Sequence, residues 1–200
     1  MASDPFRFDS GSLALDLVAT LGWRSGERAD RLSRPEDFAA WLGQAGLASP
    51  APEVGEAGHA AALALREAID HAARGAARGE VPEPADRLMI NRLAGLPLRV
   101  PGLDVDGRLE WSATDPVTAA LGTIARDAVV LVGGPDRARI RACWEPRCAM
   151  LFVDRSRGHR RRWCSMAACG NRAKVAAHRE RGRAGRAAPS PPVEGPDGGG

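Results

Sequence analysis

The four cysteines of this 200-residue chain stand in two identically spaced pairs near its C-terminal end. The pairs are Cys143-x4-Cys148 and Cys164-x4-Cys169, and the first 142 residues contain no cysteine. Four thiolates can complete a tetrahedral zinc site, and matched spacing within one short segment is typical of metal ligands. The sequence therefore predicts one structural Zn²⁺ held by Cys143, Cys148, Cys164 and Cys169.

The residues around the pairs predict a small zinc finger. Residues 149–163 begin with the apolar run Met150–Val153, pass through Ser156-Arg157-Gly158 and end in basic residues, which indicates a hairpin. A helix-favouring stretch follows Cys169, so the order resembles a treble clef. So short a segment has little core of its own, and metal binding on the order of 10 kcal/mol would supply most of its folding free energy. We expect Cys164→Ser to unfold residues 143–183 locally and to leave the N-terminal helices intact, because the two halves should have separate cores.

The charge of the chain is divided unevenly. Residues 137–186 carry a formal charge of +12, whereas the remainder carries −9. The chain has 27 arginines and one lysine, so the placement of the arginines is better evidence than their number. A basic segment beside an acidic body indicates a polyanionic partner, with nucleic acid as the first candidate.

Ten cations of the predicted finger are candidate DNA contacts. Five lie on its hairpin and turn, and five on its last helix, where Arg172, Arg179 and Arg183 would form one stripe. A solvated charged face is the alternative, and Arg147, Arg162 and Arg172 could instead be outer partners of the zinc-bound sulphurs. The predicted DNA contacts are Arg155, Arg157, Arg160, Arg161, Arg162, Arg172, Lys174, Arg179, Arg181 and Arg183.

The N-terminal part reads as a mainly α domain with a small β-hairpin. Ser33 with Glu36 predicts a capping box, and Asp115 followed by Pro116 predicts another helix start. Asp106-Gly107 is typical of a tight hairpin turn. Apolar spacing and helix formers predict helices over residues 12–21, 33–46, 53–78, 85–94 and 114–132.

We expect three regions: a helical sensing domain over 1–135, the zinc finger over 136–184, and a disordered tail over 185–200, which is rich in Ala, Gly and Pro. The start MASDPFRFDS has no long apolar segment, so we expect no signal peptide and a cytoplasmic location. No uninterrupted apolar run approaches 20 residues, so we expect no membrane span.

We expect no enzymatic activity. The sequence lacks motifs such as HExxH, GxSxG or a glycine loop that binds phosphate. The sequence is also compatible with a ligand pocket between helices that binds a small-molecule effector. No residue can be assigned to such a pocket from the sequence.

Three segments of the C-terminal part resemble the CGNR zinc finger. They are Phe152–Arg157, Arg161–Met166 and Cys169–Lys174, the last of which contains the sequence CGNR. In that family the finger forms the C-terminal half of a bacterial two-part protein. The resemblance implies zinc binding by the four cysteines.

The N-terminal half of such proteins is the ABATE domain, which is named as a stress-induced transcription regulator. Leu13–Asp16, Asp37–Leu42 and Leu65–Ile69 are similar to its pattern, so the resemblance covers about residues 6–186. One departure is Ala19-Thr20, where the family often has Asn-Thr. If that Asn lines a pocket in relatives, the pocket would differ here.

These observations predict a one-component transcription regulator that binds double-stranded DNA through a zinc-dependent end. A zinc module that binds RNA or protein is the alternative from another class. A thiol redox sensor that releases zinc on oxidation is a third reading, since arginines lower the pKa of nearby thiols.

Overall fold

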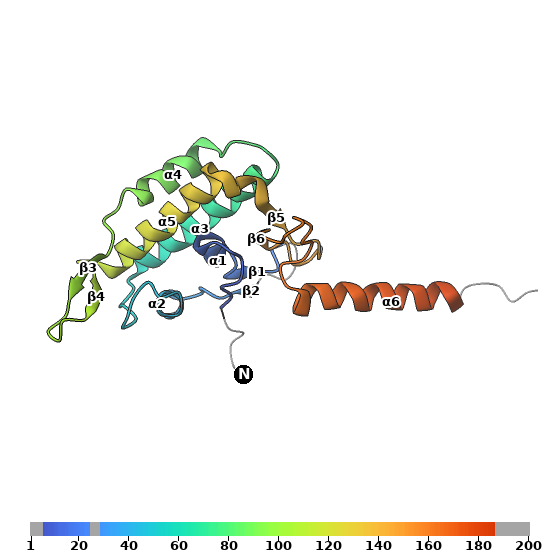
Figure 1. Cartoon of the computed structure of the whole chain (residues 1–200), viewed down its shortest axis with the longest axis horizontal. Helices are drawn as coiled ribbons and strands as arrows, with labels where there is room; N and C mark the ends of the chain where they lie inside the picture. Colours follow the sequence, from blue (N-terminus) through green and yellow to red (C-terminus); the bar gives the residue numbers. More distant parts are fainter. Residues whose placement is uncertain (1–5, 25–28, 187–200) are drawn as a thin grey trace, which may run out of the picture. The chain divides into compact units, whose positions relative to one another are not determined.

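The computed structural model describes residues 6–24 and 29–186, apart from the side chains of residues 177 and 180–186 (Figure 1). The chain forms two compact units, Met1–Cys164 and Ser165–Gly200, and each is described by itself.

The first unit is built on a layer of helices. The helices α3 (Glu56–Ala77), α4 (Pro84–Ala94) and α5 (Pro116–Gly133) pack against one another, and α1 (Leu13–Val18) packs on α3 and α5 (Figure 1). The helix α2 (Pro35–Gln44) packs on α3 and places Phe38 and Trp41 in the core. The mainly helical fold predicted from the sequence is confirmed.

Small residues allow α3 to lie at the centre of this layer. Its buried positions include Ala62, Leu65, Ile69, Ala72 and Ala76, which recur at intervals of three or four residues and form one face. Alanine is the best helix former and adds little bulk, so neighbouring helices can approach this face closely.

Two helix starts show local and long-range capping. Asp115 caps α5, because its Oδ1 accepts hydrogen bonds from the N–H groups of Val117 (3.0 Å) and Thr118 (3.1 Å), as predicted. The helix α1 is capped from α5: Asp127 Oδ2 accepts from the Ser12 hydroxyl (2.5 Å) and from the Ala14 N–H (2.8 Å).

The predicted cap of α2 was placed one residue too early. The N-terminal capping residue is Arg34, whose N–H donates to Asp37 Oδ2 at 3.0 Å, rather than Ser33 with Glu36. The Ser33 hydroxyl instead donates to the carbonyl of Asp30 at 3.0 Å. Pro35 has no N–H to be satisfied at the first helical position, which favours this register.

Among the described residues of this unit, the strands form three short antiparallel pairs. They are β1 (Leu21–Gly22) with β2 (Ala29–Asp30), β3 (Val100–Leu103) with β4 (Leu109–Ser112), and β5 (Ile140–Ala142) with β6 (Leu151–Val153). The predicted hairpin at Asp106-Gly107 is confirmed as β3–β4, with Gly107 at φ 72° in its turn.

The hairpin predicted within residues 149–163 is formed by different strands. Only β6 lies in that range, and its partner β5 precedes Cys143, with Ile140 opposite Val153 and Ala142 opposite Leu151. The short 3₁₀ helix η1 (Pro135–Arg139) leads into β5. The first cysteine pair therefore lies on the connection between two paired strands.

The expectation of two separate cores is wrong. Ile140, Leu151 and Val153 are nearly inaccessible to solvent and belong to the same hydrophobic core as the helices. β5 and β6 pack on α3, and the Val153 N–H donates to the carbonyl of Ser10 at 2.8 Å. The start of the finger is therefore part of the helical body.

The helix α5 is long and apolar enough to cross a membrane by length and composition. A helix in the core of a folded domain can have the same length and composition, and half of α5 is buried inside the molecule.

The second unit contains η2 (Met166–Gly170) and α6 (Asn171–Arg186). Ser165 begins η2, since its hydroxyl accepts from the Ala168 N–H at 3.2 Å. Residues 187–200 of the predicted tail lie outside the described residues, whereas residues 185 and 186 belong to α6.

Candidate metal centre

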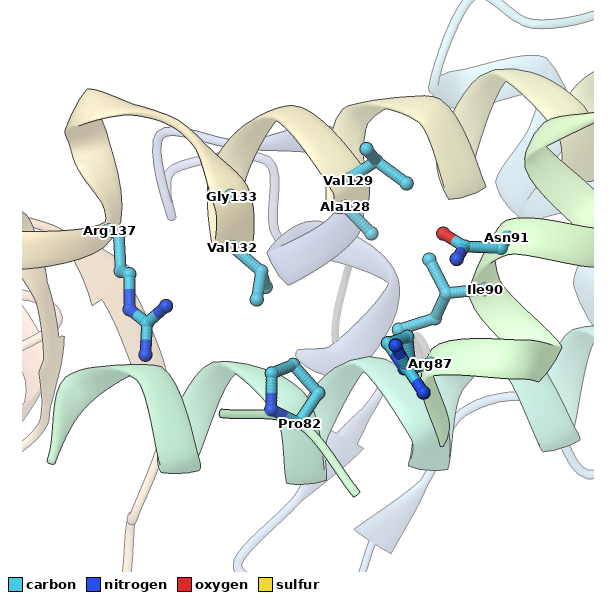
Figure 2. A pocket seen from close by; sticks show the side chains of 9 residues that line it. All are labelled: Pro82, Arg87, Ile90, Asn91, Ala128, Val129, Val132, Gly133 and Arg137. Carbon is cyan, nitrogen blue, oxygen red and sulfur yellow. The ribbon is translucent and has the colours of Figure 1, made fainter. Parts of the chain in front are cut away.

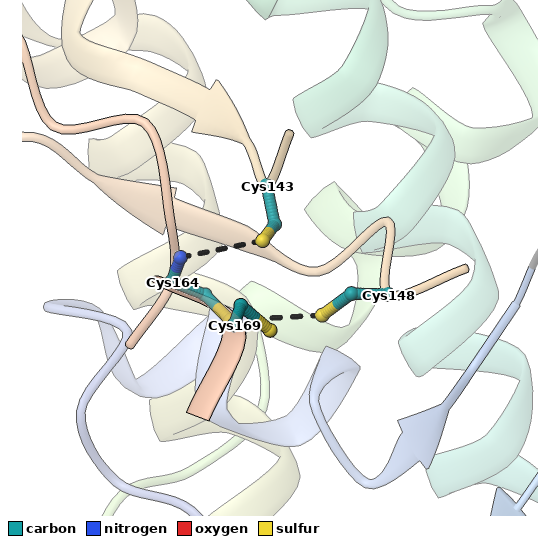
Figure 3. A group of neighbouring side chains, drawn as sticks. All are labelled: Cys143, Cys148, Cys164 and Cys169. Atoms are coloured by element: carbon teal, nitrogen blue, oxygen red, sulfur yellow. Dashed lines mark hydrogen bonds between the residues drawn. The ribbon is translucent and has the colours of Figure 1, made fainter. Parts of the chain in front are cut away.

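Two of the four cysteines come from the connection between β5 and β6, and the other two come from the segment that leads into η2 and from η2 itself (Figure 3). Cys143 follows β5 directly, and its N–H donates to the carbonyl of Met150 at 2.8 Å. The Cys148 N–H donates to the carbonyl of Glu145 at 2.9 Å, which closes a tight turn between the two cysteines. Cys164 ends the first unit, and Cys169 lies in η2.

The geometry of the cluster fits zinc. The four sulphur atoms lie within 4.8 Å of one another, and Cys148 Sγ and Cys164 Sγ are 3.6 Å apart. A tetrahedral zinc ion with bonds of about 2.3 Å sets its sulphurs about 3.8 Å apart, whereas a disulfide needs about 2.05 Å. All four cysteines are free and buried. The zinc site predicted from the sequence is confirmed as a cluster of four cysteine sulphurs.

The charge of the thiols also indicates a cation. The hydrogen bond with Cys148 lowers the pKa of the Cys143 thiol, whereas the hydrogen bond with Cys143 raises the pKa of Cys148. The opposite directions arise because adjacent buried sulphurs cannot all ionise together without compensation. A dication supplies that compensation and allows all four to be thiolates.

N–H groups surround the sulphurs and offset their remaining negative charge. The Cys164 N–H donates to Cys143 Sγ at 3.5 Å. Arg172 Nη2 lies 3.3 Å from Cys169 Sγ, in the outer role foreseen for it. Arg7 Nη1 donates to Cys164 Sγ at 3.5 Å and also lies 3.3 Å from Met150 Sδ. Metal sites depend on such oriented outer partners.

Arg7 was missed by sequence reasoning. It lies 157 positions from Cys164 in the chain, so no local spacing connects the two. The other two candidates for this outer role make different contacts. Arg162 lies over the rings of Trp144 (5.2 Å) and Trp163 (5.3 Å), and Arg147 lies over Trp23 (5.9 Å).

A second arginine ties the first cysteine pair to the helical body. Arg74 on α3 donates from Nη2 to the carbonyl of Ala149 at 2.8 Å, and its Nε donates to Asp70 Oδ2 at 2.9 Å. The residue after Cys148 is therefore fixed by α3 as well as by the metal ligands.

The loop after β6 is organised by Asp154, which is fully buried. Its carboxylate accepts from the N–H of Ser156 (3.0 Å), the hydroxyl of Ser156 (2.6 Å) and the N–H of Arg161 (3.0 Å). Burial alone would raise the pKa of Asp154, but the hydrogen bonds from Ser156 outweigh it and lower the pKa. The charged carboxylate thus fixes both ends of residues 155–161.

The predicted DNA contacts of the first unit differ in their placement. Arg155, Arg157, Arg160 and Arg162 are exposed, and Arg155 pairs with Asp136 at 2.8 Å. Arg161 is folded inward: its guanidinium lies 4.5 Å from the centre of the Phe152 ring and donates to the carbonyls of Trp163 and Cys164. Arg161 therefore supports the fold of the loop.

In the second unit, Arg172, Lys174 and Arg179 are exposed on α6. The backbones of Arg181 and Arg183 belong to α6, but their side chains lie outside the described residues.

Comparison with known proteins gives two family matches. The model of ABATE, described as a putative stress-induced transcription regulator, matches residues 11–135. The model of the CGNR zinc finger matches residues 139–182. A search of curated proteins finds no match.

Proposed function

Because the chain belongs to the ABATE family and carries a CGNR zinc finger, we propose that this zinc-binding regulator acts by binding double-stranded DNA in the cytoplasm. The helical body senses a signal, and the metal-held end contacts the nucleic acid. The role is one of binding and regulation, without catalysis.

The observation that carries this proposal is the arginine loop beside the metal centre. Arg157 and Arg160 are exposed on a loop whose ends are both fixed by buried Asp154. Side chains held on an ordered backbone lose less entropy on binding than those on a free loop. Arginine also forms bidentate hydrogen bonds with phosphate, so this loop suits a phosphate backbone.

The helix α6 supports the same partner independently. Arg172, Lys174 and Arg179 are exposed on it, and the formal charge of residues 137–186 is +12. Phosphate contacts of this kind give affinity that is independent of sequence and decreases as salt increases.

Fluorescence anisotropy with a labelled DNA duplex tests the proposal on the zinc-loaded full chain. We expect the logarithm of affinity to fall linearly with the logarithm of salt concentration. Replacing Arg157 and Arg160 by alanine should make the slope shallower by about 2, since each phosphate contact contributes about 0.9. Arg78→Ala is the matched control, because Arg78 is exposed but pairs with Glu80 on the body. An affinity that does not respond to salt would contradict the proposal.

The alternative partner is decided in the same assay. An RNA duplex of matched sequence presents an A-form helix with 2′-hydroxyl groups, which is a different surface. Stronger binding to RNA than to DNA would replace the proposed partner. The burial of all four sulphurs favours a structural metal over a redox sensor, because oxidation requires accessible thiolate.

A further inference from the structure

A hollow of about 200 Å³ lies between α4, α5 and η1 (Figure 2). Its walls are apolar and include Ile90 from α4 with Ala128, Val129 and Val132 from α5. An engineered apolar cavity of about 150 Å³ accommodates a benzene molecule. The hollow therefore has room for one ring or a short alkyl chain.

The polar groups around the hollow favour an anion. Arg87 on α4 and Arg137 on η1 both line it, and the amide of Asn91 adds a further donor (Figure 2). No acidic side chain occurs among the described residues that line it. Arg137 also donates to the carbonyl of Glu80, which holds its guanidinium in place. An apolar floor with two guanidinium groups is complementary to an apolar molecule with one negative charge.

A second hollow, of about 250 Å³, has different chemistry. It is lined by Arg99, Glu110 and Trp111, among others. The guanidinium of Arg99 is already used by the carbonyls of Gly46 (3.1 Å) and Leu47 (3.0 Å) and lies 5.9 Å from the centre of the Trp111 ring. Glu110 would repel an anion, so this hollow does not offer the same site.

We propose that the hollow between α4, α5 and η1 binds a small monocarboxylate with an apolar body, whose negative charge is stabilised by Arg87 and Arg137 at the two ends of the hollow (Figure 2). The inference builds on the proposed function, since such a ligand would be the effector of the regulator.

The position of Arg137 connects this site to the metal centre. Arg137 belongs to η1, which leads into β5 and then to Cys143. The preceding residue, Asp136, pairs with Arg139 (3.0 Å) and with Arg155 (2.8 Å) of the arginine loop. A ligand that interacts with Arg137 therefore contacts the same short helix, η1, that contains Asp136, the partner of Arg155.

Isothermal titration calorimetry of the zinc-loaded full chain with octanoate, and with benzoate as the ring counterpart, tests this site without DNA. We expect saturable binding of at least one of them at a single site. Octan-1-ol and benzyl alcohol should bind at least tenfold more weakly, because they lack the charge that the arginines stabilise.

Three variants and one control locate the binding. Arg87→Gln and Arg137→Gln should each weaken carboxylate binding at least tenfold. Gly133→Leu should abolish it by filling the hollow, because a Cβ at Gly133 meets no atom within 4 Å and so adds no clash. Arg92→Gln is the control, since Arg92 is on α4 but does not line the hollow. It should bind as the unchanged chain does, and circular dichroism confirms the fold of each variant.

Absence of carboxylate binding overturns the inference, as does equal binding of the alcohols or of the folded Gly133→Leu variant. These outcomes leave the DNA assay untouched. Loss of DNA binding with carboxylate binding retained would remove the proposed function and leave the site in place.

Discussion

The helical body and the metal centre are stabilised by different interactions. In the body, large apolar side chains such as Trp41, Phe38 and Leu15 are fully buried among helices, and their removal from water stabilises the fold. In the metal centre, the buried side chains are four sulphurs that would repel one another as thiolates without a cation. One region excludes water, whereas the other needs an ion.

The hairpin β5–β6 belongs to both regions. Its apolar residues Ile140, Leu151 and Val153 complete the helical core, and the connection between its strands carries Cys143 and Cys148. Only part of the finger should therefore depend on metal. When the ion is lost, the strands should stay folded, whereas the cysteine-bearing turns and the residues that follow them should unfold.

The largest effect is expected from removing a metal ligand. Cys164→Ser should abolish stoichiometric zinc and remove a contribution on the order of 10 kcal/mol. Hydrogen exchange should then show lost protection in residues 143–150 and 155–170, with protection retained in 140–142 and 151–153. Elemental analysis of the purified chain measures the zinc.

His178→Ala is the matched control, because His178 is exposed on α6 and lies outside the sulphur cluster. It should retain one zinc per chain. One zinc per chain in Cys164→Ser would contradict the assignment of Cys164 as a metal ligand. Global loss of helix in this variant would contradict the expectation that the helical body stays folded without zinc.

A core substitution in the hairpin β5–β6 tests whether the hairpin stabilises the helical body. Leu151→Ala should lower the free energy of unfolding by about 2–5 kcal/mol, because Leu151 is 2% exposed and packs in the common core. Chemical denaturation of the zinc-loaded chain measures the change.

Leu103→Ala on β3 is its control, since that side chain is 76% exposed and should change stability little. If the two substitutions cost the same, the hairpin does not contribute to the core as described.

A smaller effect is expected from the arginine that joins the regions. Arg7→Gln should weaken zinc affinity by about 10- to 100-fold, because the charge that donates to Cys164 Sγ is lost. Competition with a metal chelator gives the affinity. Arg78→Gln, at an exposed pair with Glu80, should leave it unchanged. Unaltered zinc affinity in Arg7→Gln would show that this contact does not tune the metal.

The smallest effect concerns the body alone and depends on pH. Burial raises the pKa of Asp16 from 3.8 to about 6, and the nearby charges of Asp9 and Asp127 add to this. Between about pH 4 and pH 6, the folded state keeps a proton on Asp16 that the unfolded state has lost. The contribution of Asp16 to the free energy of unfolding is therefore fully present below about pH 4 and is lost as pH rises through about 6.

Asp16→Asn removes that dependence while its amide oxygen can still accept from the Ser10 N–H. Its melting temperature should exceed that of the unchanged chain by more at about pH 7 than at about pH 5, on the order of a few degrees. Taking the difference between the two chains at each pH cancels the contribution of zinc. Asp106→Asn, at the exposed β3–β4 turn, should show no such difference. An advantage independent of pH would refute the role given to Asp16.

Features whose residues lie close together along the chain could be predicted from the sequence. The cysteine pairs, the cap at Asp115 and the turn at Gly107 each depend on residues a few positions apart, and the structure contains all three. The cap of α2 was misplaced by one residue, because Ser33 and Arg34 compete for the same role and the proline decides between them.

Features that join distant segments escaped prediction. The pairing of β5 with β6, the capping of α1 by Asp127 and the contact of Arg7 with Cys164 have no local signature, since each depends on tertiary packing. The role of Asp154 was also missed, although its neighbours Ser156 and Arg161 are near in sequence. An aspartate between apolar and basic residues gives no indication that its carboxylate will be fully buried.

The place of β5 and β6 in the common core has a consequence for biosynthesis. During translation the helices emerge first, and the part of the apolar surface of α3 that β5 and β6 contact stays uncovered until Ile140 and Leu151 follow. Nascent chains that stall before this hairpin would expose that surface to chaperones and proteases. Production of the intact protein is therefore tied to translation through the cysteine-bearing end.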